Sequence, residues 1–306
     1  MFSEKKKPQK NRVKPAETDP AIEKAMKTPE FESYIENLRL FTQSDLVIIV
    51  LDARNPFSCR YTPYEDLLGD KILFVINKID LVPRESVYGW NMAFNNISKT
   101  ISISAAHNTE QLLTYIREKS DSKRIFKICI TGLINMGKKT IEEHIKQLNN
   151  VSVTRTKDWI WMTPTPDLIA MGSFPLSTVS GNIIACARDL FSRCTIQSLM
   201  DVFSFSFSTD SENVFNSIDR NKRTAAIELF RRLSDGRIKF YSVPPSMFLT
   251  DLGPLNSDPY LKVSPLYDQF CDGIIALGSS TPNSVIRSLI PVLHSLAAKK
   301  EKKQNP

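Results

Sequence analysis

The chain has 306 residues, of which 42% are hydrophobic and 24% are charged, and this composition excludes collagen-like and wholly disordered proteins. No run reaches the roughly 18 uncharged apolar residues that a membrane-spanning helix needs, so we expect no membrane association. The formal net charge is +7, with +5 in residues 1–14 and +3 in residues 299–306. Basic ends of this kind suit RNA phosphates and nuclear import receptors; solvated ends without a specific partner are the alternative.

Taken in chain order, the apolar patterns predict helices that alternate with strands. A helical pattern starts near Phe31, and further helices are predicted at 109–119 and 137–148. Continuous apolar runs, typical of strands buried on both faces, are found at 45–51, 72–76 and 126–131, with a weaker one at 101–104. Strands alternating with helices indicate an α/β fold with a parallel sheet.

Beyond residue 181 the pattern changes, and the segments 182–191, 224–233 and 284–298 favour helix. This change predicts a second, smaller and mostly helical domain. The expected organisation is a flexible basic tail, an α/β domain, a helical domain and a second basic tail, at residues 1–30, 31–180, 181–298 and 299–306.

The tetrapeptide Asn77-Lys78-Ile79-Asp80 directly follows the predicted strand 72–76. Ligand contacts in parallel α/β sheets come from the carboxyl ends of the strands. A carboxylate at Asp80 can accept hydrogen bonds from both N1–H and the exocyclic amine of guanine, a pair of donors that adenine lacks. Asn77 would tie neighbouring loops together, and the stem of Lys78 would lie across the base. Alone the match is weak, and a polar turn is the alternative.

A second motif, Ser104-Ala105, ends the next predicted strand. In guanine-specific proteins such a pair presents a backbone N–H to O6 of the base. The dipeptide carries almost no information by itself, but it supports a guanine site because it follows the Asn-Lys-x-Asp motif.

The third motif runs from Gly132 to Lys138, after the predicted strand 126–131 and at the start of a predicted helix. Its GxxxxGK spacing is that of a phosphate loop, in which glycines turn backbone N–H groups inward and the lysine reaches the terminal phosphates. Lys139 follows where Ser or Thr would bind magnesium, and Thr140 would replace it only if the backbone shifted by one residue. The predicted nucleotide site comprises Asn77, Lys78, Asp80, Ser104, Ala105, Gly132, Asn135, Met136, Gly137, Lys138, Lys139 and Thr140.

The order of these motifs is informative, because in ordinary GTPases the phosphate loop precedes the guanine motif and here it follows. In this order the chain resembles the circularly permuted GTPases of the nucleostemin and nucleolar GTP-binding protein group. Ile134 stands where the family usually has Pro. The resemblance is carried by DARNP, NKIDLVPRESVYGW, TGLINMGKKT and TAAIELFRRLSDGRIKFYSVPPS, at residues 52–56, 77–90, 131–140 and 224–246. The last segment predicts an alanine-rich helix followed by a short aromatic strand.

The resemblance implies a three-layer, P-loop GTPase-like sheet in circularly permuted order, followed by the helical domain. It also implies that GTP or GDP is the ligand and that the protein acts in assembly of the large (60S) ribosomal subunit in the nucleolus. The expected partners are pre-60S particles and ribosomal RNA, and an import receptor would bind the basic tail.

The sequence departs from the family at the switch motif, which should read Asp-x-Pro-Gly after an apolar strand. The nearest match is Met162-Thr163-Pro164-Thr165, after the apolar residues 159–161, and only Thr154 or Thr156 matches the upstream switch threonine. The Asp normally holds magnesium and the Gly N–H senses the γ-phosphate. A need for Mg²⁺ is therefore left open, and we assign no catalytic residue and no metal ligand.

These departures predict a degenerate GTPase that recognises guanine but has weak or no hydrolysis. The alternative is a scaffold that has lost nucleotide binding and works through its basic tails and helical domain.

Overall fold

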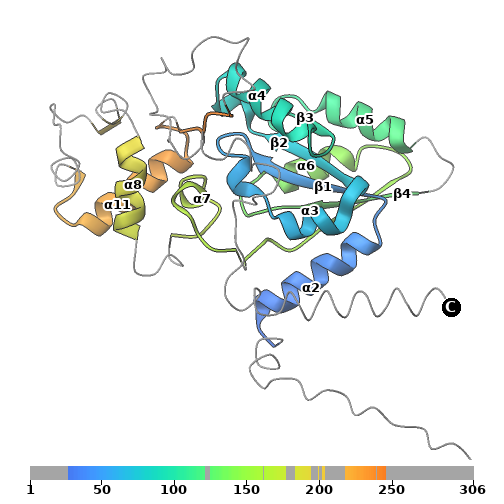
Figure 1. Ribbon diagram of the computed structural model, residues 1–306, viewed down its shortest axis with the longest axis horizontal. Helices are drawn as coiled ribbons and strands as arrows, with labels where there is room; N and C mark the ends of the chain where they lie inside the picture. Colours follow the sequence, from blue (N-terminus) through green and yellow to red (C-terminus); the bar gives the residue numbers. More distant parts are fainter. Residues whose placement is uncertain are drawn as a thin grey trace, which may run out of the picture.

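The computed structural model describes residues 27–120, 125–160, 162–176, 183–193, 199, 202–203, 218–238 and 240–245 (Figure 1). Most of the basic tail 1–30, all of the tail 299–306 and the predicted helix 284–298 lie outside these residues. Within the described ranges, no helix combines the length and hydropathy that crossing a membrane requires.

Five parallel strands form the centre of the α/β domain, in the order β3-β2-β1-β4-β5. Every residue of β1 and β2 is buried, as expected for strands covered by helices on both faces. The predicted parallel α/β fold is confirmed. The strands are β1 Leu46–Asp52, β2 Ile72–Asn77, β3 Thr100–Ser102, β4 Phe126–Thr131 and β5 Val151–Arg155.

The apolar residues before the nearest switch-motif match do not form a strand where the structure describes them, because Trp159 and Ile160 lie in the loop that follows β5. β5 pairs only with β4 and exposes alternate residues, so it lacks the continuous apolar run of a central strand. The apolar character of Trp159 has another cause. Its indole is buried and donates from Nε1 to Thr131 Oγ1 at 2.8 Å.

Helices cover both faces of the sheet and make it the middle of three layers (Figure 1). Right-handed crossovers place α3 and α4 on one face and α5 and α6 on the other. α2 joins the first face, where the ring centroids of Tyr34 and Tyr64 lie 5.2 Å apart. The bounds are α2 Pro29–Thr42, α3 Thr62–Leu68, α4 Arg84–Asn95, α5 Glu110–Ser120 and α6 Lys138–Ile145, with single 3-10 turns at Phe57–Cys59, Gly69–Lys71 and Ile79–Leu81.

Three further helices, α7 Pro166–Ala170, α8 Ile183–Arg193 and α11 Lys222–Ser234, gather beside one end of the α/β domain (Figure 1). The helices expected at 182–191 and 224–233 are therefore present. The aromatic strand expected after α11 is not, because residues 240–245 have no strand pairing. Ser242 anchors this segment instead: its N–H donates to Arg54 O at 2.6 Å, and its carbonyl accepts from Trp90 Nε1 at 3.1 Å.

Thr131, the last residue of β4, fixes the path of the chain beyond β5. Its hydroxyl oxygen accepts from Thr156 Oγ1 at 2.9 Å as well as from the Trp159 indole. All three side chains are buried, so a donor that lost this acceptor would stay unsatisfied.

We expect Thr131→Val, which keeps the shape and removes the hydroxyl, to lower the free energy of unfolding by about 1–3 kcal/mol. Urea denaturation followed by tryptophan fluorescence measures the change. Thr131→Ser keeps the hydroxyl and is the control. Equal stability of the Val variant and the wild type would show that the hydroxyl is not needed.

Candidate functional site

The candidate site lies at the carboxyl edge of the sheet, between β1 and β4. Strand order reverses there, because the chain proceeds from β1 toward β3 but from β4 toward β5. Crevices at such reversal points are where open α/β sheets bind ligands. Asp52 ends β1 beside Asn77, its partner in register at the end of β2, and Gly132 follows β4.

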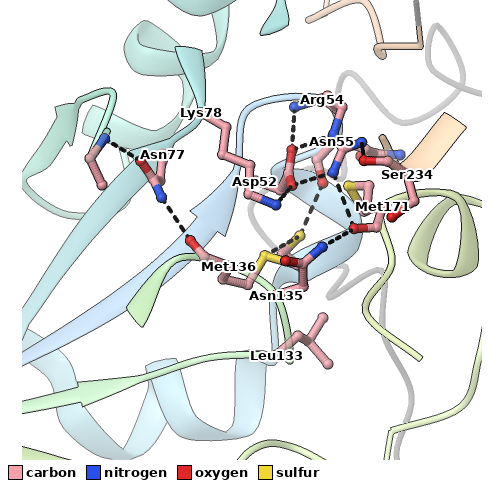
Figure 2. Close-up of polar contacts among 12 residues, drawn as sticks. Asp52, Arg54, Asn55, Asn77, Lys78, Leu133, Asn135, Met136, Met171 and Ser234 are labelled. Carbon is pink, nitrogen blue, oxygen red and sulfur yellow. Dashed lines mark hydrogen bonds and ion pairs between the residues drawn. The ribbon is translucent and has the colours of Figure 1, made fainter. Parts of the chain in front are cut away.

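One side chain joins the three predicted motifs. Asn77 is buried, its Nδ2 donates to Met136 O at 2.8 Å, and its Oδ1 accepts from the Ala105 N–H at 2.8 Å (Figure 2). Asp80 is exposed, and its Oδ1 accepts from the Ser104 hydroxyl at 2.5 Å. The structure therefore brings the guanine motif, the Ser-Ala pair and the phosphate loop together.

Two of the predicted site residues have partners within the chain. The Ala105 N–H, one of the backbone donors of the Ser-Ala pair, is bonded to Asn77. The ammonium group of Lys78 lies 2.9 Å from Asp52 Oδ2 (Figure 2). Its backbone is left-handed, with φ 65°.

The loop 132–138 has the form of a phosphate-binding turn that opens α6. Gly132, Asn135 and Gly137 all have positive φ, at 140°, 61° and 86°. A Cβ on Gly137 would lie 2.3 Å from Asn77 Nδ2, so only glycine allows the bridging amide its place. Lys138 is buried and donates from Nζ to the carbonyls of Gly132, at 2.8 Å, and Leu133. Burial lowers the pKa of Lys138, and the nearby carboxylate of Asp158 opposes that shift.

The residues at the two magnesium positions implied by the family do not fit that ion. Mg²⁺ takes oxygen ligands in near-octahedral geometry. The side chain of Lys139 is 78% exposed, with its ammonium 3.9 Å from Glu143 Oε1, and Met162 is a buried thioether. Thr140 lies one residue further inside α6. Neither Lys139 nor Met162 offers the oxygen ligand that Mg²⁺ would need at these positions.

Sequence reasoning missed the charged centre beside the loop, although its signal was an Asp at the end of an apolar run with an Arg two residues later. Asp52 and Arg54 form a buried ion pair with Nη2–Oδ2 at 2.9 Å. Burial would raise the pKa of Asp52, but the charges of Arg54 and Lys78 outweigh it and lower that pKa to about 2.

Arg54 also connects the α/β domain to the helices beyond it. It donates to Met171 O, directly after α7, at 3.1 Å (Figure 2). It also donates to Leu233 O, near the end of α11, at 3.1 Å. Asn135 of the phosphate loop donates to the same Met171 carbonyl at 3.1 Å. The next residue, Gly172, lies so close that a Cβ there would be 2.8 Å from Asn135 Nδ2 and 2.5 Å from Ser234 Oγ.

A cavity of about 840 Å³ opens at the phosphate-loop side of the site. Its walls are the start of α2, the loop from Asn135 to Lys139, and the segment from Arg155 to Ile160. Acidic and basic side chains both line it, among them Glu36 and Asp158 opposite Lys138 and Lys157.

The chain is similar in sequence and in structure to known GTP-binding proteins. No model of a known protein family matches the chain. An uncharacterized GTP-binding protein of Methanocaldococcus jannaschii is 24% identical over 67% of this chain and 65% of its own length. The nuclear/nucleolar GTPase 2 of Oryza sativa is 30% identical over 42% of this chain and 27% of its own length. GNP-bound YlqF from T. maritima matches in structure with a TM-score of 0.50 and 18% identity, over 70% of this chain and 97% of that one.

The sheet order and the sequence of motifs define an α/β protein with the fold of a circularly permuted GTPase. The resemblance to the nucleostemin-like group of these proteins is confirmed by the sequence relatives. The chain spans less than two thirds of the length of the two relatives named here.

Gly137→Ala tests the close contact between the loop 132–138 and the side chain of Asn77. We expect it to cost about 1–3 kcal/mol in backbone strain and, in addition, to displace the Asn77 amide. The control is Gly69→Ala, which also has a positive φ of 51° but meets nothing within 4 Å. Chemical denaturation should show the larger loss for Gly137→Ala, and equal losses would contradict the close contact.

The ion pair of Asp52 predicts a pH dependence. Because its folded-state pKa is about 2 and that of an unfolded Asp is about 3.9, its contribution to stability is complete above about pH 4. It is lost as the pH falls toward about 2. Asp52→Asn should therefore be less stable than the wild type at pH 6, and the gap in unfolding free energy should narrow below about pH 4. A constant gap in urea titrations across this range would show that the pair does not titrate in this way.

Proposed function

We propose that this chain is a guanine-nucleotide-binding protein. The observation that carries the proposal is the side chain of Asn77, which links the phosphate loop at Met136 to the Ser-Ala loop at Ala105. This link places an exposed carboxylate, that of Asp80, near a turn that opens a helix, and Ser104 holds the carboxylate in place. A nucleoside diphosphate or triphosphate has both groups that such a site recognises, a base edge with two donors and a chain of anionic oxygens.

We further propose that hydrolysis of GTP is weak or absent. Phosphoryl transfer depends on electrostatic stabilisation of the transferring group, normally with a metal bridging the β and γ oxygens. The chain presents Lys139 and Met162 where oxygen ligands would help to hold that metal. Binding with little turnover is the activity that these residues favour.

The cellular role that we propose is assembly of the large (60S) ribosomal subunit in the nucleolus. The support is a relative named as a nuclear/nucleolar GTPase together with the basic ends, residues 1–14 and 299–306, on a body of nearly neutral charge. Pre-60S particles and ribosomal RNA are the proposed partners, since Lys-rich segments bind phosphate backbones without reading sequence. An import receptor would bind the same Lys-rich ends.

Titration with a fluorescent GDP tests the binding proposal. The variant Asp80→Asn sharpens the test, because it should change the affinities for guanine and xanthine nucleotides in opposite directions. The carboxylate matches the two donors of guanine, whereas an amide can donate to the 2-carbonyl of xanthine. We expect Asp80→Asn to lose GDP affinity by tenfold or more, on the order of the 1–3 kcal/mol cost of an unpaired buried group, and to gain xanthosine diphosphate. Asp70→Asn removes an exposed carboxylate at the opposite end of β2 and should change neither.

The same titration is repeated with EDTA, and phosphate release from GTP is measured alongside. Steady phosphate release that EDTA abolishes would contradict the proposal of weak hydrolysis. No saturable GDP binding by the folded wild type would overturn the nucleotide proposal and support the scaffold alternative.

A further inference from the structure

The ammonium group of Lys138 is fully occupied within the chain. A lysine has three N–H donors, and here the acceptors are the carbonyls of Gly132 and Leu133 and the carboxylate of Asp158. The Nζ–Oδ1 distance to Asp158 is 2.6 Å. Any phosphate that uses this lysine must therefore replace one of the three.

Asp158 is the acceptor that can leave. Gly132 and Leu133 are buried, and their carbonyls are part of the loop itself. The side chain of Asp158 is 43% exposed and belongs to residues 156–160, which follow β5 and form neither helix nor strand. Rotation of one side chain into solvent would free the third donor.

The other cations at the cavity also have carboxylate partners. Lys157 Nζ lies 2.7 Å from Glu36 Oε2, and Arg155 Nη1 lies 3.4 Å from Glu142 Oε2. Two further cations of the cavity wall are thus paired with carboxylates, and Asp158 is the carboxylate that reaches the phosphate-loop lysine.

We propose that Asp158 is an internal counter-ion that competes with the phosphates of the ligand for Lys138, and so limits nucleotide affinity. This inference rests on the proposed function, and it assigns to Asp158 a role in setting the affinity of the same site. With Asp158 in contact, the lysine has a partner in the absence of ligand. When a diphosphate enters, the anionic oxygens replace the carboxylate, which must also move away from them because the charges are alike.

The test is Asp158→Asn, which keeps the size of the side chain and removes its charge. Affinities for fluorescent GDP and for inorganic pyrophosphate are measured with wild type and variant, the second by isothermal titration. We expect both affinities to rise roughly threefold to tenfold, the range for a partly exposed, charge-assisted pair. Glu36→Gln is the matched control, because it removes a carboxylate that lines the same cavity but pairs with Lys157 and not with Lys138.

The outcomes separate the two claims. If GDP binds both proteins with affinities within twofold, or binds the variant less tightly, the counter-ion role is overturned and the nucleotide proposal stands. An equal gain for Glu36→Gln would also overturn it, since the effect would be long-range charge alone. If pyrophosphate gains affinity in the variant but GDP binds no better than pyrophosphate, the counter-ion stands and guanine recognition fails. If neither ligand binds either protein, both claims fail.

Discussion

A guanidinium taken out of water has to find an acceptor for each of its five N–H groups, and at Arg54 this requirement joins the two parts of the chain. Nε and one N–H of Nη2 bond the carboxylate of Asp52. The other N–H of Nη2 bonds Met171 O, and Nη1 bonds the carbonyls of Leu233 and Ser234. Carbonyls at helix ends are not all used within the helix, and those at the ends of α7 and α11 supply the remaining acceptors of Arg54.

The residues of the site differ in how strongly the fold itself requires them. Asn77 and Gly137 are needed by the structure, since the buried amide bridges two loops and the glycine makes room for it. Their presence would be explained even without a ligand. Asp80 is exposed, and its contact with Ser104 contributes little to the stability of the fold. Its carboxylate is therefore more specific support for a base-binding site than Asn77 or Gly137.

The residues at the two positions where the family would bind magnesium differ in the same way. Lys139 is exposed and Met162 is buried among apolar side chains. An exposed side chain such as that of Lys139 can change with little cost to the fold, whereas Met162 packs in the core. The fold is thus compatible with residues at these positions that are not oxygen ligands.

Much of the fold could be predicted because β1 and β2 hold continuous apolar runs and β4 exposes only Lys127. The motifs at the ends of these strands follow from spacing alone. β5 could not, because an edge strand buries few residues and resembles a loop in sequence. Trp159 is buried although it lies in a loop, and its indole donates to Thr131. The roles of Arg54 and Asp158 depend on packing between distant segments, such as the 179 residues that separate Arg54 from Leu233, and no local pattern encodes them.

Gly172 shows how finely the two parts of the chain are fitted. Asn135 from the phosphate loop and Ser234 from the end of α11 both lie within 3 Å of the point that a Cβ on this residue would occupy. A single methyl group at this point would act as a wedge, and the phosphate loop and the last helical turn of α11 could not both keep their places. Residue 172 therefore has room for a hydrogen atom but not for a side chain, and this sets how closely the phosphate loop and α11 approach each other. Any movement of the loop away from Met171 would widen the gap between them.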